Sequence, residues 1–152
     1  MTTIGDTVDY TDILLVEDSP TDLELTESAL AATNLDCQLQ IARDGEEALD
    51  FLLCRGPFSE RDITQGPRVV LLDLKLPKID GLEVLRELRR DPRTRILPIV
   101  VLTSSAEDRD LVESYQLGVN SYIVKPVDFE QFTEAVHQLG LYWLLLNHLP
   151  SP

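Results

Sequence analysis

Short, uninterrupted runs of apolar residues recur along the chain. The clearest of them occupy residues 13–16, 69–72, 99–102 and 122–124. Because both faces of each run are apolar, they are typical of parallel strands that are covered on both sides. A weaker run over residues 38–42 predicts one further strand, at the edge of the sheet.

Segments between and after these runs have apolar residues at helical spacing. The marking positions are Leu23 and Leu30, residues 46–53, Leu82, Leu85 and Leu88, Leu111, Val112 and Tyr115, and finally Phe129, Phe132, Val136 and Leu139. Five strands that alternate with five helices predict an α/β fold with a doubly wound parallel sheet. Functional sites of such sheets lie outside the carboxyl ends of the strands.

The chain of 152 residues has the length of one domain, which we place at residues 12–147. Residues 1–11 are polar and predict a flexible N-terminal tail, and residues 148–152 predict a short C-terminal tail. The polar segment 56–67 contains two Gly-Pro pairs and predicts an extended loop before the third strand.

Composition and charge narrow the class of protein. The chain has 27 acidic and 13 basic residues, a net charge of -14 and no run of Lys or Arg, which disfavours direct nucleic-acid binding. The apolar run 141–146 is too short to span a membrane, and no signal peptide opens the chain. Cys37 and Cys54 lie in apolar-periodic segments, which favours buried thiols in a reducing compartment. We therefore expect a cytoplasmic protein.

Reactive side chains stand at the carboxyl ends of four of the predicted strands. They are Glu17 and Asp18, Asp73, Thr103 and Ser104, and Lys125. Each alone has an ordinary explanation, as a turn or cap residue or as a solvated lysine. Their joint placement at successive strand ends favours one site instead, because these ends meet at the same edge of a parallel sheet.

The residue types at this edge suit phosphoryl transfer to a carboxylate. Neighbouring carboxylates repel one another, and a bound cation relieves that repulsion. Oxygen-only ligands select a hard ion, with Mg²⁺ as the usual choice. A carboxylate such as Asp73 can attack phosphorus and form an acyl phosphate, while Thr103 and Lys125 serve the oxygens of the transferring group.

Four motifs resemble the receiver domain of bacterial two-component response regulators. They are I-L-L-V-E-D, V-V-L-L-D-L-K-L-P-K-I-D-G, V-V-L-T-S-S and S-Y-I-V-K-P, and the resemblance runs from about Asp12 to Leu146. It implies a flavodoxin-like sheet with strand order 2-1-3-4-5. It also implies that Asp73 is the phosphoacceptor and that a sensor histidine kinase is the donor.

The resemblance further implies a role for each residue of the site. Asp18 and Asp73 would bind Mg²⁺ through their carboxylates, Lys75 through its backbone carbonyl, and Glu17 through metal-bound water. Thr103 and Lys125 would contact the phosphoryl group, Tyr122 would turn inward on activation, the Lys125–Pro126 bond would be cis, and Pro77 and Gly81 would shape the turn after Asp73.

The segment 56–67, the sequence D-L-K-L-P and the late Tyr142-Trp143-Leu144 are similar to stand-alone receivers that partner bacterial phytochrome kinases. The apolar run 141–146 would circle a whole helix, so one face cannot pack on its own sheet. We therefore predict a homodimer through the last helix, with Trp143 as anchor. The alternative is that residues 147–152 fold back over the run.

Other classes of protein remain as rivals. Haloacid dehalogenase-type hydrolases carry a second Asp two residues after the nucleophile, where this chain has Lys75, which argues against an enzyme that turns over external substrates. A flavin or nucleotide binder would need a Gly-rich or hydroxyl-rich loop after the first strand, where Glu17 and Asp18 would repel phosphate. A receiver that never accepts phosphate is the third rival, and the complete set of site residues argues against it.

Overall fold

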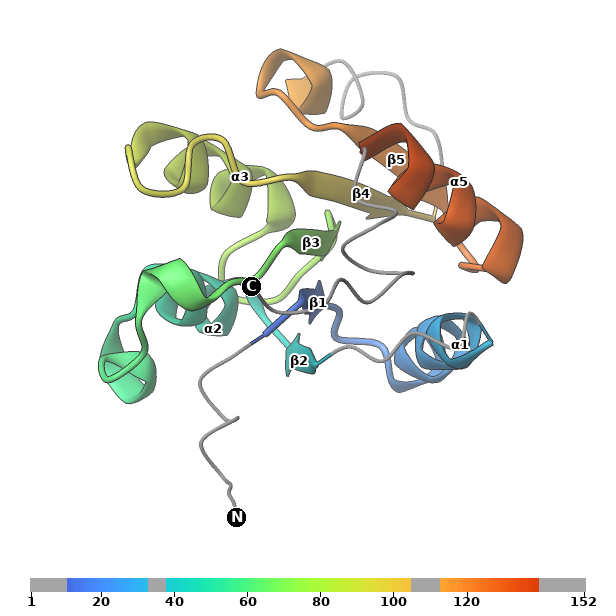
Figure 1. The fold of residues 1–152 in the computed structure, drawn as a ribbon, viewed down its shortest axis with the longest axis horizontal. Coiled ribbons are helices and arrows are strands. Elements are labelled where there is room, and N and C mark those ends of the chain that lie inside the picture. Colours follow the sequence, from blue (N-terminus) through green and yellow to red (C-terminus); the bar gives the residue numbers. More distant parts are fainter. Residues whose placement is uncertain (1–10, 33–37, 105–112, 140–152) are drawn as a thin grey trace, which may run out of the picture.

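The fold is built on one parallel sheet, shown in Figure 1. The computed structural model describes residues 11–32, 38–104 and 113–139, with side chains up to residue 134. Five strands pair in the order β2-β1-β3-β4-β5. Their bounds are β1 Ile13–Val16, β2 Leu39–Ala42, β3 Val69–Asp73, β4 Ile99–Thr103 and β5 Ser121–Val124. The predicted strands and their order are confirmed, and the weaker strand β2 lies at the edge as expected.

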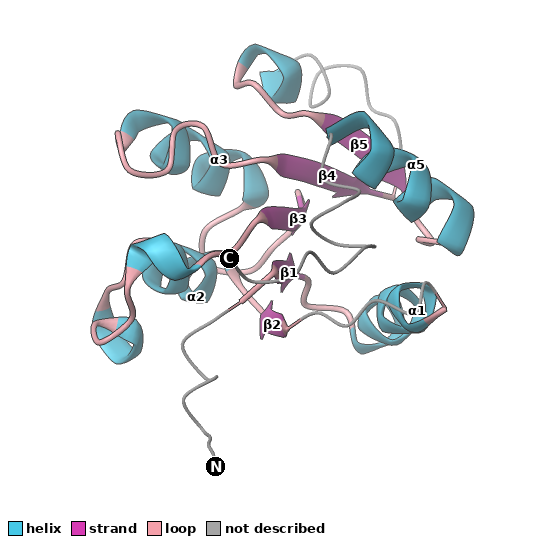
Figure 2. Ribbon diagram, in the orientation of Figure 1, coloured by secondary structure: helices cyan, strands magenta, loops and turns pink. Residues whose placement is uncertain are grey.

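Helices cover both faces of the sheet (Figure 2). Those described in full are α1 Pro20–Ala31, α2 Gly45–Leu52, α3 Gly81–Arg90 and α5 Phe129–Leu139. Residues 113–116 are also helical and belong to the predicted fourth helix, of which Leu111 and Val112 lie outside the described residues. No helix in the described part of the chain is long and apolar enough to cross a membrane.

Alternate residues of the inner strands enter two separate cores. Leu14 and Val16 of β1 pack with α2 and α3, whereas Ile13 and Leu15 pack with α1 and α5. Successive side chains of a strand point to opposite faces, so a strand covered on both sides must be apolar at every position. This arrangement explains the uninterrupted apolar runs that form β1, β3 and β4. The run 122–124 does not follow the prediction of a strand covered on both sides, because β5 lies at the edge of the sheet and leaves Tyr122 and Val124 exposed.

Helix α3 starts in direct contact with the end of β3. Its N-cap Asp80 accepts a hydrogen bond from the amide of Glu83 at 3.1 Å, and the amide of Gly81 donates to the carbonyl of Leu74 at 3.0 Å. A Cβ atom at Gly81 would lie 2.4 Å from the carbonyl oxygen of Asp73, which is closer than real Cβ atoms approach. Glycine at this position therefore lets the helix begin beside Asp73.

The segment before β3 differs from the extended loop that the sequence predicts. It contains two short 3-10 helices, Gly56–Phe58 and Ile63–Gln65. The guanidinium of Arg61 donates to the carbonyls of Phe51 and Gly66 and stacks over the Phe51 ring at 3.8 Å from its centroid. One side chain thus ties the segment back onto the end of α2, and the segment is compact for that reason.

Two smaller predictions have mixed outcomes. Cys54 is a free thiol, but it is only partly buried, because it follows α2 with a φ of 55° and lies beside the exposed segment. Cys37 and residues 1–10 lie outside the described residues. Thr11 of the predicted tail is buried, and its amide donates to the carbonyl of Gln65 at 3.2 Å. The domain boundaries as a whole stay a prediction.

Candidate functional site

Strand register brings the predicted residues to one edge of the sheet. Val16 of β1 pairs with Leu72 of β3, so the residues that follow, Glu17 and Asp73, lie on adjacent strand ends. Asp73 pairs with Leu102, which places Thr103 at the end of β4. Thr103 itself pairs with Val124 of β5, the residue before Lys125. The amide of Lys125 donates to the carbonyl of Thr103 at 2.8 Å and extends this pairing by one residue.

Three carboxylates gather at the centre of this edge. Glu17, Asp18 and Asp73 each offer an oxygen within 4.8 Å of the others. Glu17 and Asp73 are buried, whereas Asp18 is exposed and opens the cluster to solvent. The amide of Lys75 donates to Oδ1 of Asp73 at 3.1 Å, which orients that carboxylate.

Lys125 is the cation of the cluster. Its Nζ atom lies 2.8 Å from Oε1 of Glu17, 2.9 Å from Oδ2 of Asp73 and 2.9 Å from Oδ2 of Asp22. The contact with Asp22 is absent from the sequence-based prediction. Asp22 stands in the first turn of α1, and no sequence pattern indicates that it faces Lys125, 103 residues further along the chain.

The burial and close packing of these charged groups shift the pKa values of Glu17 and Lys125. Burial raises the pKa of Glu17 to about 7, and Asp73 adds to the rise while Lys125 opposes it. Burial lowers the pKa of Lys125, but Glu17, Asp22 and Asp73 outweigh that effect and raise it overall. The cluster thus holds more negative charge than one ammonium balances.

The donor set fits a hard divalent cation. All three clustered side chains offer oxygen, which Mg²⁺ prefers. Oε1 of Glu17 is buried and accepts no aligned hydrogen bond, although the Lys125 ammonium lies beside it as an ion pair. A buried acceptor of this kind is costly unless a cation or a donor satisfies it.

Thr103 and Tyr122 lie beside the cluster on β4 and β5. Thr103 is buried, whereas Tyr122 is 39% exposed and packs edge-on against Tyr115 with 6.1 Å between the ring centroids. The Lys125–Pro126 bond is cis, as the resemblance implies. Tyr122 therefore has the outward position that a switch residue would leave on activation.

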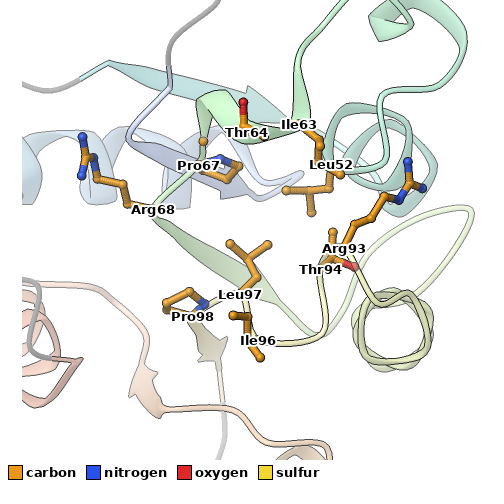
Figure 3. Close-up of a pocket in the computed structure, with 11 residues that line it drawn as sticks. Leu52, Ile63, Thr64, Pro67, Arg68, Arg93, Thr94, Ile96, Leu97 and Pro98 are labelled. Carbon is orange, nitrogen blue, oxygen red and sulfur yellow. The ribbon is translucent and has the colours of Figure 1, made fainter.

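A separate pocket lies at the opposite edge of the sheet, where β3 and β4 begin (Figure 3). It measures about 450 Å³, and Leu52, Ile63 and Leu97 are among the residues that line it. Arg68 at its rim pairs with Asp12 at 3.1 Å, and Arg93 pairs with Asp91 at 2.8 Å and lowers the pKa of that carboxyl to about 2. These charges are matched, so the pocket lacks the charge excess of the carboxyl edge.

Comparison with known proteins agrees with this geometry. The family model of the response regulator receiver domain matches residues 13–137. Response regulator Rcp1 of Synechocystis is 39% identical over 91% of this chain and 92% of its own. Its Mn²⁺-bound crystal structure has a TM-score of 0.72, with 37% identity over 93% of this chain and 99% of that one.

Two further solved structures are similar. The bacteriophytochrome response regulator AtBRR is 53% identical with a TM-score of 0.80, and the match covers 91% of this chain and 99% of that one. The phosphorylated cyanobacterial phytochrome response regulator RcpA is 38% identical with a TM-score of 0.74, over 93% of this chain and 99% of that one. The chain therefore belongs to the response regulator receiver domain family, the phosphoryl acceptors of two-component signalling.

Proposed function

We propose that Asp73 is the phosphoacceptor and that Mg²⁺ is the cofactor of the transfer. The observation that carries the proposal is the position of the Asp73 carboxylate. The Lys125 ammonium lies 2.9 Å from it, and it offers an oxygen within 4.8 Å of oxygens of Glu17 and Asp18. The Mn²⁺-bound form of Rcp1 supports divalent-cation binding in a relative of this chain.

The chain's own residues would divide the work of the transfer. A carboxylate oxygen of Asp73 attacks phosphorus, the bond between phosphorus and the donor atom breaks, and the donor atom keeps the electron pair. Lys125 offers an N–H to a phosphoryl oxygen, and the Thr103 hydroxyl donates to another. Glu17, Asp18, Asp73 and the Lys75 carbonyl would hold Mg²⁺, which when bound neutralises charge on the phosphoryl oxygens.

We infer that the protein is a switch and turns over no external substrate. Lys75 occupies the position where Asp-dependent hydrolases carry a second acid. Phosphorylation at Asp73 would draw Thr103 inward and move Tyr122 from exposed to buried. Thr103→Ala should accept phosphate without the NMR shifts around Tyr122 that accompany phosphorylation of the wild type. Identical shifts in both proteins would contradict this coupling.

We propose that the phosphoryl donor is a sensor histidine kinase of the bacterial phytochrome type. We also propose that this protein acts in the cytoplasm. Support comes from AtBRR and RcpA, both of which are phytochrome response regulators. The free thiol of Cys54 suits a reducing compartment. The net charge of -14 favours protein partners over nucleic acid.

We also propose a homodimer through the last helix. Residues 141–146, with the predicted anchor Trp143, lie outside the described residues. Exposed Phe129 in the described part of the last helix, α5, and exposed Tyr122 on β5 support an apolar interface on this side of the molecule. Charged substitutions at Trp143 and Leu146 should give a folded monomer by sedimentation. A wild type that sediments as a monomer, with and without phosphate, would exclude the dimer.

Labelling tests the phosphoacceptor directly. Acetyl phosphate with Mg²⁺ should add one phosphoryl group to the wild type, as measured by intact mass, and none to Asp73→Asn. Asp91→Asn is the matched control, because Asp91 lies far from the cluster in the loop after α3. It should be labelled at the wild-type rate. Equal labelling of wild type and Asp73→Asn would refute the assignment.

A further inference from the structure

Among the described residues, Asp22 is the one side-chain partner of Lys125 that lies outside the carboxylate cluster. Its Oδ2 atom is 2.9 Å from Nζ, and this contact joins the first turn of α1 to the end of β5, 103 residues away. The amide of Asp22 donates to Oγ of the N-cap Ser19 at 3.2 Å, so the start of the helix holds Asp22 in place. An acidic residue is also favourable at a helix N-terminus, because the helix dipole is positive there.

Three carboxylates surround the ammonium of Lys125, which donates to Asp22 and Asp73 and forms an ion pair with Glu17. A lysine ammonium has three N–H donors, and Glu17, Asp22 and Asp73 each offer it a carboxylate oxygen at 2.8–2.9 Å. The side chain of Lys125 is only 11% exposed, so water cannot readily replace a lost partner. A phosphoryl oxygen that contacts Lys125 must therefore compete with one of these carboxylates.

Charge indicates which carboxylate is the competitor. Glu17 and Asp73 belong to the cluster that fits a cation, which would take up part of their negative charge. Asp22 is not a member of that cluster, so its full charge stays on Lys125. Asp22 also adds negative charge close to the place where an anionic phosphoryl donor must arrive.

We propose that Asp22 is a positioning residue that competes with the phosphoryl group for Lys125 and so restrains phosphorylation of Asp73. The inference rests on the proposed function of Asp73 and adds a determinant of its rate. In this proposal, the contact between Asp22 of α1 and Lys125 after β5 slows the phosphorylation of Asp73. The contact closes when Asp73 is free and loosens when the phosphoryl group takes a donor of Lys125.

The rate of labelling by acetyl phosphate with Mg²⁺ tests whether Asp22 slows phosphorylation. Asp22→Asn and Asp22→Ala both remove the competing carboxylate, and we expect each to be labelled about two- to fivefold faster than the wild type, the range of a partly exposed ion pair. Glu24→Gln is the matched control, since it removes a charge from an exposed position of the same helix. Its rate should equal that of the wild type.

The NMR resonance of the Lys125 ammonium provides a second readout that a charge effect at a distance would not move. It should shift in resting Asp22→Asn and stay in place in Glu24→Gln. An unchanged or slower labelling rate in Asp22→Asn would overturn the inference, and so would faster labelling with an unmoved Lys125 resonance. A wild type labelled elsewhere than Asp73, by peptide mapping, would instead overturn the proposed function.

Discussion

The carboxyl edge of the sheet, where the strands end, and the amino edge, where β3 and β4 begin, differ in how their charges are paired. At the carboxyl edge one ammonium, Lys125, faces Glu17, Asp22 and Asp73. At the amino edge, beside the apolar pocket, each of the two arginines at the rim has a carboxylate of its own, as in the pair of Arg68 and Asp12. Paired charges hold loops together and leave nothing for a ligand to neutralise. The buried negative charge that Lys125 leaves unbalanced at the carboxyl edge favours binding of a cation, as the proposed function requires.

The largest change in the free energy of unfolding is expected when Glu17 is replaced by the neutral Gln and stability is measured without metal. Its pKa is about 7 in the folded protein against an ordinary 4.5, so its contribution to stability is complete below about pH 4.5 and is lost as the pH rises through about 7. In EDTA, Glu17→Gln should match the wild type near pH 4. At pH 8 it should be more stable, by up to about 3 kcal/mol in urea unfolding.

The comparison would break if Glu17→Gln were less stable than the wild type at pH 8. That result would mean that Lys125 stabilises the ionised form of Glu17 more than burial opposes it. Glu24→Gln removes a charge from the exposed surface of α1 and serves as the reference.

Mg²⁺ should stabilise the folded protein only by binding at the carboxyl edge. At a concentration one hundred times its dissociation constant, Mg²⁺ should add about 2.7 kcal/mol to the free energy of unfolding of the wild type. The gain should vanish in Asp18→Asn and persist in Asp91→Asn, which alters the amino edge. An undiminished gain in Asp18→Asn would exclude Asp18 from the metal site.

The smallest effect should come from the paired amino edge. Arg68→Ala should lower the free energy of unfolding by about 1 kcal/mol, because Asp12 keeps a hydrogen bond from the amide of Gln38 at 2.8 Å. Neither Mg²⁺ affinity nor the labelling rate should change. A change in either would show that the two edges are coupled, and the comparison between them would need revision.

Most of the fold could be predicted because its signals are local. The apolar runs that form β1, β3 and β4 are buried on both faces, and nothing but a covered strand explains them. The residues that gather at the site could be predicted because the carboxyl ends of parallel strands lie at the same edge of the sheet. The two 3-10 helices of segment 56–67 could not be predicted, since they depend on the Arg61 side chain, which bridges the carbonyl of Phe51 in α2 and that of Gly66 near the end of the segment.

The contact between Asp22 and Lys125 was missed for a related reason. Which side chain of α1 faces β5 depends on how the helix packs across the sheet, and no pattern within α1 records this. The helix itself was predicted, and so was the reactive lysine. What remained unknown was the rotation of α1, which selects Asp22 and turns exposed Glu24 away.

The compact segment 56–67, which contains the two 3-10 helices, also divides the site along the chain. Glu17, Asp18 and Asp22 precede it, whereas Asp73, Thr103 and Lys125 follow it. A chain cut within this segment would give two fragments, neither of which holds a complete set of ligands. Recovery of Mg²⁺ binding on mixing would then report directly that the fragments have reassembled, so the protein contains the elements of a split reporter.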